Sequence, residues 1–211
     1  LIEGRGEEFG VATRYEPADG VAPDRAVALE WWINAHQPFG LGAALARDGL
    51  REHFGNEWLV AVSYHGMEPE PDPLANPFST WMTEAYGRGG PRHAADGLYD
   101  LPAAARTRFK QEVYDACRDA VLKRLEEPGG FKITLSAQAD ASGVHGQAIV
   151  HGYADPGMLL QLMVCERGVL FPGKSGVVIH HDVARASLTT PMEGLEYVPE
   201  ANGMTVNFSR T

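Results

Sequence analysis

The chain has 211 residues, of which 44% are hydrophobic and 22% are charged. This length predicts one or two domains, and the composition favours a packed core and argues against a disordered chain. The 24 glycines and 14 prolines predict many turns and argue against a helical bundle.

The formal net charge is −10 and is unevenly distributed. Residues 1–104 contain 7 Arg, no Lys and 16 acidic residues, whereas residues 105–211 contain 11 basic and 12 acidic residues. No stretch clusters Lys and Arg, so the electrostatic attraction that dominates nucleic-acid binding is missing. The acidic first half would also be repelled by an anionic membrane surface. We therefore expect no nucleic-acid partner.

No run of about 18 apolar residues is present, so the sequence predicts no membrane-spanning segment. The first residues, Leu1-Ile2-Glu3-Gly4-Arg5, match a factor Xa recognition sequence left by protein expression, and residues 1–6 are excluded from fold reasoning. The two cysteines, Cys117 and Cys165, are too few for a disulfide framework and are not spaced as metal ligands.

The first half of the chain alternates between strand-like and helix-like segments. Pro23 suits the first position of a helix, and the unbroken apolar run 58–62 predicts a strand buried on both faces, as in a parallel sheet. A stripe of apolar residues every four positions predicts a long helix that ends at Pro128; its members are Phe109, Val113, Cys117, Val121 and Leu125. In chain order, we expect a strand over 9–15, helices over 23–32 and 41–53, a strand over 58–62, a helix over 77–86, a strand over 92–95 and a helix over 103–127.

From Phe131 onward the apolar period changes from about four to two, as expected for strands with one buried face. Further strands are expected over 144–153, 158–166, 177–187, 194–198 and 203–208. Six short strands at this spacing favour an antiparallel sandwich of the immunoglobulin-like type. The sequence therefore predicts an α/β domain over 7–128 and an all-β domain over 129–211.

Three segments suggest which fold this order of elements belongs to. They are the strand ending at Tyr64-His65 with the loop Asp72-Pro73-Leu74, the segment from Tyr86 to Pro91, and Cys165-Glu166 followed by 179–186. Together they resemble a thioredoxin-like domain joined to a β-sandwich, an arrangement similar to that of bacterial, mostly exported proteins. The resemblance implies a periplasmic or cell-surface location.

Thioredoxin chemistry needs a Cys-x-x-Cys pair at a helix N-terminus, where the helix dipole stabilises a thiolate. By the resemblance, the matching position falls within Asp19-Gly20-Val21-Ala22-Pro23-Asp24, which contains two acids and no cysteine. Cys117 lies on the apolar stripe of a helix and Cys165 inside a strand. The leading hypothesis is therefore a redox-inactive binding or structural module rather than an enzyme.

The resemblance also implies a cis-proline at Pro91, which would shape a binding groove for a protein or peptide. The alternative is a trans proline in an ordinary turn. The residues expected to line this groove are Asp19, Asp24, Trp31, His65, Pro91 and His93.

A rival hypothesis is a metal-binding protein or metalloenzyme that uses zinc or copper. One candidate site combines His65 with Glu68, Glu70, Asp72 and His93 at the end of a parallel strand, where ligands of open α/β sheets bind. The alternative is a solvated acidic loop. The other site would join the histidines of two neighbouring strands: His145 and His151 on one, His180 or His181 on the other.

Adjacent histidines in a strand point to opposite faces, so His180 and His181 cannot join one ligand set without distortion. In the competing interpretation, His181 is a core residue hydrogen-bonded to Glu166 or Arg185. These last two residues are also expected to form an internal ion pair.

A third hypothesis is a thiol-dependent oxidoreductase that uses Cys117 or Cys165 in an atypical way. The motifs for nucleotide binding are absent from the sequence, and so are those of serine hydrolases and zinc proteases. We therefore expect no nucleotide cofactor.

Overall fold

The computed structural model shows mixed α/β structure with few helices and several sheets. It divides into two compact units, and the first contains both the N-terminal part up to Glu127 and the later segment Cys165–Arg185. The second unit comprises Pro128–Val164 and Ala186–Thr211. The structure describes residues 9, 14–17, 19–38, 40–66, 70–86, 92–97, 99–101, 109–152, 157–190, 192–200 and 203–211.

This division differs from the expected boundary at residue 128, because part of the later chain returns to the first sheet. Strand β11 (Val183–Ser187) pairs in parallel with β2 (Leu59–His65), with Val183 opposite Ser63. A segment that completes the sheet of the first unit shares its core, so it groups with that unit.

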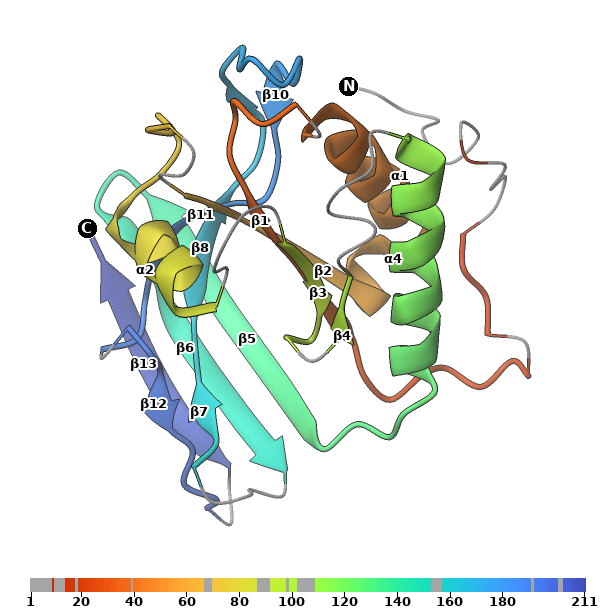
Figure 1. Cartoon of the computed structure of the whole chain (residues 1–211). Coiled ribbons are helices and arrows are strands. Elements are labelled where there is room, and N and C mark those ends of the chain that lie inside the picture. Colours follow the sequence, from red (N-terminus) through yellow and green to blue (C-terminus); the bar gives the residue numbers. More distant parts are fainter. Residues whose placement is uncertain are drawn as a thin grey trace. The chain divides into compact units, whose positions relative to one another are not determined.

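The first unit is built on a six-stranded sheet in the order β4-β3-β1-β2-β11-β8 (Figure 1). β1 and β2 are parallel, whereas β3 is antiparallel to β1 and to β4. This order is compatible with the expected thioredoxin-like domain. The bounds not yet given are Val27–Ile33 for β1, Arg92–Ala95 for β3, Tyr99–Asp100 for β4 and Met163–Glu166 for β8.

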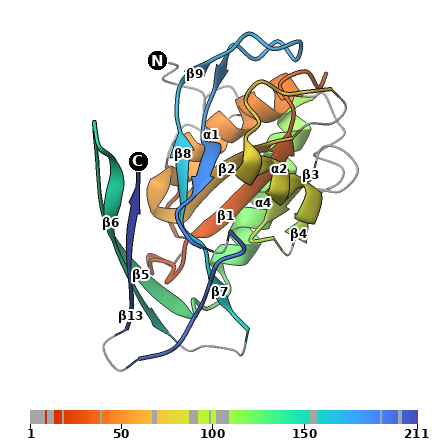
Figure 2. The ribbon, with the colours of Figure 1, turned by 90° about the vertical axis from the view of Figure 1, so that its left-hand side faces the viewer.

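Helices cover both faces of this sheet. Figures 1 and 2 show α1 (Gly40–Trp58) and α4 (Lys110–Leu125) on one side and α2 (Pro77–Tyr86) on the other. The fully buried core on the α1 and α4 side includes Leu29 and Trp31 of β1. None of the described helices is long and apolar enough to cross a membrane.

The helix expected over 23–32 is wrong, because residues 27–33 form β1. Trp31 and Trp32 point to opposite faces of this strand, and only 0% and 2% of their surfaces are exposed. Trp32 donates a hydrogen bond from Nε1 to the carbonyl of Met82 in α2. A strand buried on both faces lacks the alternation of apolar and polar residues that identifies strands in a sequence. In β1 the apolar residues instead fall at positions that also fit a helix.

The strand expected over 9–15 is not observed in the described residues, because Phe9 lies in a 3₁₀ turn and neither Arg14 nor Tyr15 belongs to a strand. The helices over 41–53 and 77–86 and the strands over 58–62 and 92–95 are confirmed. The long helix is confirmed from Lys110, but Phe109 precedes it and is 70% exposed, so it is not part of the buried stripe. Residues 10–13 and 103–108 lie outside the described residues.

The second unit is β-rich, as expected from the change of period. β5 (Phe131–Asp140), β6 (Gly143–Gly152) and β13 (Met204–Arg210) form an antiparallel sheet in the order β13-β6-β5. Two further short strands, β7 (Leu159–Leu160) and β12 (Leu195–Glu196), pair with each other. Val150, Leu160, Tyr197 and Val206 form its buried core. The described strands establish a β-rich unit without identifying an immunoglobulin-like sandwich.

Within the first unit, strands β9 (Val169–Leu170) and β10 (Ile179–His180) form a hairpin that leads into Asp182. The Asp182 carboxylate accepts hydrogen bonds from Arg51 Nη1 at 3.1 Å and Arg167 Nε at 2.9 Å. Its carbonyl accepts the Ser63 N–H at 2.8 Å. Asp182 therefore ties the hairpin to both α1 and β2.

We expect Asp182→Ala to lower the free energy of unfolding by about 2–4 kcal/mol. The change removes a carboxylate that is only 4% exposed and that binds both Arg51 and Arg167. Urea unfolding measures the change. Asp115→Ala is the matched control: this carboxylate pairs with Arg118 on α4 but is 42% exposed, so its loss should cost less than about 0.5 kcal/mol. Equal stabilities of the Asp182→Ala variant and the wild type would contradict this role.

Candidate functional site

The candidate site lies where β1 and β2 end at the same edge of the sheet. Ile33 and His65 are paired neighbours and are the last residues of the two strands. The loop 34–38 follows β1, and the loop containing Asp72 follows β2. Ligands of open α/β sheets bind at the carboxyl ends of parallel strands, so these loops occupy a favourable position for a site.

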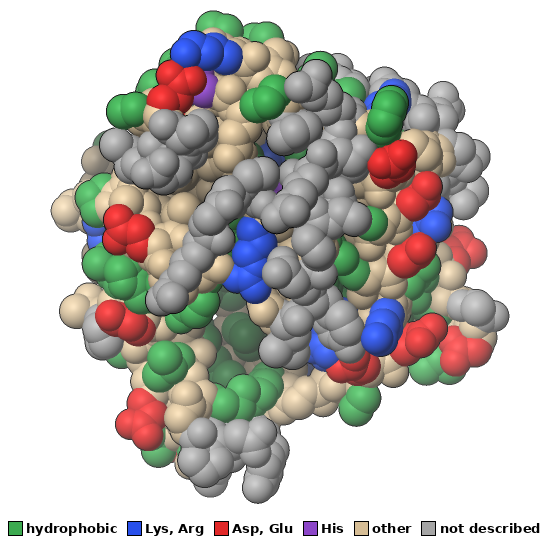
Figure 3. Space-filling view, viewed as in Figure 1, with side chains coloured by type: hydrophobic (Ala, Val, Ile, Leu, Met, Phe, Trp, Pro, Cys, Tyr) green, Lys and Arg blue, Asp and Glu red, His purple; other side chains and the backbone are tan. Residues whose placement is uncertain are grey.

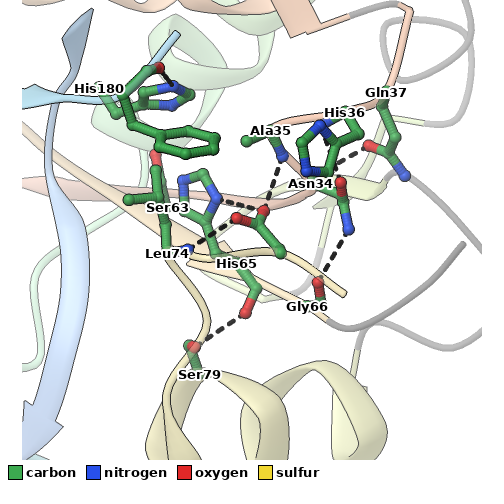
Figure 4. A network of polar contacts seen from close by, with 12 residues as sticks. Asn34, Ala35, His36, Gln37, Ser63, His65, Gly66, Leu74, Ser79 and His180 are labelled. Carbon is green, nitrogen blue, oxygen red and sulfur yellow. Dashed lines mark hydrogen bonds and ion pairs between the residues drawn. The ribbon is translucent and has the colours of Figure 1, made fainter. Parts of the chain in front are cut away.

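Asp72 is the centre of a buried polar network, and Figure 4 labels its partners His65, Ala35 and Leu74. Its Oδ2 lies 2.7 Å from His65 Nδ1 and accepts the Ala35 N–H at 2.6 Å, while Oδ1 accepts the Leu74 N–H at 2.8 Å. Burial alone would raise the pKa of this carboxyl, but the hydrogen bond and charge of His65 and the two backbone N–H groups outweigh it and lower the pKa. Asp72 is therefore ionised at neutral pH.

His65 is fully buried and is oriented by this carboxylate. An ionised carboxylate only accepts hydrogen bonds, so the Nδ1 of His65 carries a proton. None of the described residues forms a hydrogen bond with the other ring nitrogen, Nε2. In the neutral ring this nitrogen presents a lone pair, as in a metal ligand or a general base.

His180 lies beside His65, with ring centroids 5.3 Å apart and planes at 70°. Its Nε2 is 3.0 Å from the carbonyl oxygen of Phe171 and must donate to it. Burial, and then the nearby charges of His65 and Arg47, lower the pKa of His180 to about 4. His180 is therefore neutral at pH 7.

Other hydrogen bonds hold the two loops around this pair. Asn34 Nδ2 donates to the carbonyls of Gly66 and Glu70 at 3.0 and 2.8 Å, and the Asn34 N–H is accepted by Gln37 Oε1. Ser79 Oγ donates to the His65 carbonyl at 2.8 Å. Figure 4 shows Asn34 and Ser79 reaching Gly66 and His65 from different segments of the chain.

Asp19 and Asp24 do not lie at the start of a helix. Residues 19–24 precede β1, and the first helix after that strand begins at Gly40. The helix start expected within residues 19–24 is therefore wrong, and the first helix after β1 follows the loop that contains His36-Gln37-Pro38. The error follows from interpreting β1 as a helix.

The remaining residues expected in the groove do not form an open surface. Trp31 and His93 are buried at 0% and 1% exposure and stack with centroids 4.6 Å apart. In the sheet, β1 lies between the His93 strand and the His65 strand. Pro91 and Glu68 lie outside the described residues. Glu70 is described, and it accepts hydrogen bonds from Lys174 Nζ at 2.9 and 2.8 Å.

The histidines of the second candidate metal site lie in different units. His145 and His151 belong to β6, which pairs with β5 and β13, whereas His180 belongs to β10, which pairs with β9. β6 and β10 are therefore not paired with each other, contrary to the expectation. Among the described residues, no group of three or more His, Cys, Asp or Glu side chains is placed to hold a metal ion.

The buried member of the histidine pair is His180 rather than His181. β10 ends at His180, and Asp182 adopts a left-handed φ of 57°, so the strand alternation used in the prediction does not extend through this segment. His181 Nδ1 accepts the Gly168 N–H at 3.2 Å instead of contacting Glu166 or Arg185. Those two residues do form the expected ion pair at 2.7 Å, but its side chains are 53% and 30% exposed, so it is not internal.

Neither cysteine lies where a reactive dithiol would be expected. Cys117 is fully buried in α4, and burial raises the pKa of its thiol to about 12. For Cys165 in β8, burial and then the charge of Asp182 raise the pKa to about 12. Neither thiol is activated as a nucleophile at neutral pH.

Comparison with solved structures shows a likeness to HBP35 of Porphyromonas gingivalis, with a TM-score of 0.66 and 15% sequence identity. The match covers 87% of this chain and 63% of that chain, so this chain spans less than two thirds of its length. At this identity the likeness concerns the fold alone. No family model matches the sequence, and no curated protein matches it.

We expect His180 to make the fold sensitive to mild acid. Its pKa falls from 6.5 in the unfolded chain to about 4 in the folded protein, so the unfolded state binds more protons between these values. The contribution of neutral His180 to the free energy of unfolding is fully present above pH 6.5. About 3 kcal/mol of this contribution is lost as the pH falls to 4. Urea unfolding at about pH 7 and about pH 4.5 measures this loss.

His180→Gln should show a smaller difference between the two pH values, because it has no ring to protonate. His145→Gln is the control, since its side chain is 42% exposed, and it should keep the wild-type difference. The same pH dependence in all three proteins would show that His180 does not carry the effect.

Proposed function

We propose that the chain is a redox-inactive thioredoxin-like binding module of a bacterial exported protein. The single observation that carries this proposal is the loop between β1 and α1, where a thioredoxin dithiol would lie. Its sequence is His36-Gln37-Pro38-Phe39, with no thiol at either cysteine position. The likeness in fold to a Porphyromonas gingivalis protein supports the bacterial origin.

The placement of the two cysteines supports a function without thiol exchange. Exchange requires a thiolate that a disulfide can reach. Cys117 is enclosed among the core residues of α4, and the pKa of each thiol is raised to about 12. The alternative of an atypical thiol oxidoreductase would require one of these thiols to become exposed and ionised.

The groove suggested by the sequence is replaced by a surface around the β1–α1 loop, because Trp31, His65 and His93 are buried. We propose that this loop and the adjoining β9–β10 hairpin contact a protein or peptide partner. The two are joined by the Ser175 N–H, which donates to the Ala35 carbonyl at 3.1 Å. A hydrogen-bonded loop presents a preorganised surface, which lowers the entropy cost of binding.

The distribution of charge favours a protein or peptide over a nucleic acid. On the face shown in Figure 3, the Lys and Arg side chains of the described residues are interspersed with Asp and Glu. Along α4, for example, Arg118 pairs with both Asp115 and Asp119. Such paired cations form no continuous basic surface for a phosphate backbone.

We expect the native protein to lack dithiol reductase activity and to react slowly with thiol reagents at pH 7. Insulin-disulfide reduction and labelling with Ellman's reagent measure these properties. Both cysteines should react rapidly once the chain is unfolded in urea, which serves as the control for the reagent. Rapid native labelling together with catalytic disulfide reduction would refute the proposed function.

The location of the former dithiol position can be tested by restoring the cysteines. The variant combining His36→Cys with Phe39→Cys should gain a thiol of lowered pKa that is alkylated at pH 7 about ten times faster than an ordinary one. The matched control combines Asp19→Cys with Ala22→Cys, which has the same spacing before β1. Equal reactivity of the two variants would place the dithiol position elsewhere.

A further inference from the structure

We propose that His65 and His180 together bind one zinc or copper ion, with His65 contributing Nε2 and His180 contributing Nδ1. His180 belongs to the β9–β10 hairpin of the proposed partner surface, but the metal site requires neither a bound partner nor the absence of a dithiol, so the two proposals are tested separately. The proposal depends on how the two buried rings are held and on which of their nitrogens remain available.

The first ligand is prepared by its carboxylate partner. Histidines that bind metals commonly donate their other ring N–H to a carboxylate or a backbone carbonyl, which fixes the tautomer and the ring orientation. Asp72 accepts from His65 Nδ1 at 2.7 Å and is itself held by two backbone N–H groups. The remaining nitrogen, Nε2, is buried without a hydrogen-bond partner in the described part of the chain.

The second ligand is prepared in the other common way, by a backbone carbonyl. Because Nε2 of His180 donates to the Phe171 oxygen at 3.0 Å, its lone pair lies on Nδ1. The two histidines therefore use opposite ring nitrogens for their supporting bonds. Each has one nitrogen left for an ion, and both side chains are buried, at 0% and 3% exposure.

The distance between the rings is in the range expected for two histidines that share one ion. Zinc lies at 2.0–2.1 Å from a histidine nitrogen, which places each ring centroid roughly 3 Å from the ion. Two rings bound to one ion can then have centroids up to roughly 6 Å apart, and those of His65 and His180 are 5.3 Å apart. Their planes, at 70°, are not stacked face to face.

The charges around the rings include one that favours and one that opposes a cation. Asp72 places a carboxylate next to the first ring. Arg47 is also buried, but its Nη1 donates to Ser63 Oγ at 2.9 Å and to the His181 carbonyl at 2.8 Å, and its Nη2 lies 3.4 Å from Asp48. Arg47 is thus bound to its own acceptors, and Asp48 offsets its charge.

Two imidazoles suit zinc and copper better than the hard cations, which prefer oxygen ligands. The described residues supply no third His, Cys, Asp or Glu placed for the same ion. A four-coordinate ion would therefore keep two positions for water or an external ligand, one more than in the catalytic zinc sites with three protein ligands.

The test is titration of the metal-free protein with Zn²⁺ in competition with a chelating dye. We expect the wild type to bind one Zn²⁺ ion tightly per chain. The affinity for Zn²⁺ should fall by at least 100-fold in His65→Gln and in His180→Gln. Asp72→Asn should weaken binding by about 10–100-fold, because it removes only the supporting carboxylate. His145→Gln and His151→Gln are matched controls in β6 and should bind as the wild type does.

Circular dichroism identifies any variant that fails to fold. In that case the site is tested by a second measurement, on a protein that keeps both histidine ligands. In the variant combining His145→Gln with His151→Gln, Cu²⁺ should give an electron paramagnetic resonance spectrum with hyperfine coupling to imidazole nitrogens. The proposal is overturned if the folded wild type binds no stoichiometric Zn²⁺, if folded His65→Gln and His180→Gln variants bind as the wild type does, or if the nitrogen coupling is absent. None of these results bears on the thiol assays, so this proposal and the proposed function can fail independently.

Discussion

The Asp72 carboxylate is the interaction on which the end of the central sheet depends. One side chain accepts hydrogen bonds from His65 at the end of β2, from Ala35 just after β1, and from Leu74 in its own loop. A buried charge is tolerated only when it is fully hydrogen-bonded, and here these three partners provide that compensation. The same bonds fix the two loops that meet at the carboxyl ends of the parallel strands.

The loop after β1 is fixed by hydrogen bonds to neighbouring segments of the same network. The loop after β1 is held through backbone groups and through Asn34, which donates to the carbonyls of Gly66 and Glu70. His36 takes part as well, because its N–H donates to Asn34 Oδ1 at 2.8 Å and its ring packs edge-on against Phe171 with centroids 6.0 Å apart. These contacts hold the loop at the start of α1 without a disulfide.

Much of the fold could be predicted from sequence because most elements have a clear period or clear boundaries. Helix α2 begins at Pro77 and ends at Tyr86 as expected, and the period of two after Phe131 marks the strands of the second unit. β1 could not be recognised in the same way, because both of its faces are buried. The return of Val183 to the edge of β2 is a long-range pairing with no local signal.

The candidate site shows the same limit at the level of single residues. His65 and Asp72 could be proposed from the sequence because they lie at the end of a recognisable strand and in the loop after it. The position of His180 depends instead on a pairing of β9 with β10 that only the fold reveals. A strand of two residues followed by a left-handed Asp182 gives no alternation from which to decide which adjacent histidine is buried. His180 meets His65 because Asp182 ties the hairpin to β2 and α1, so the pair of rings is a consequence of tertiary structure.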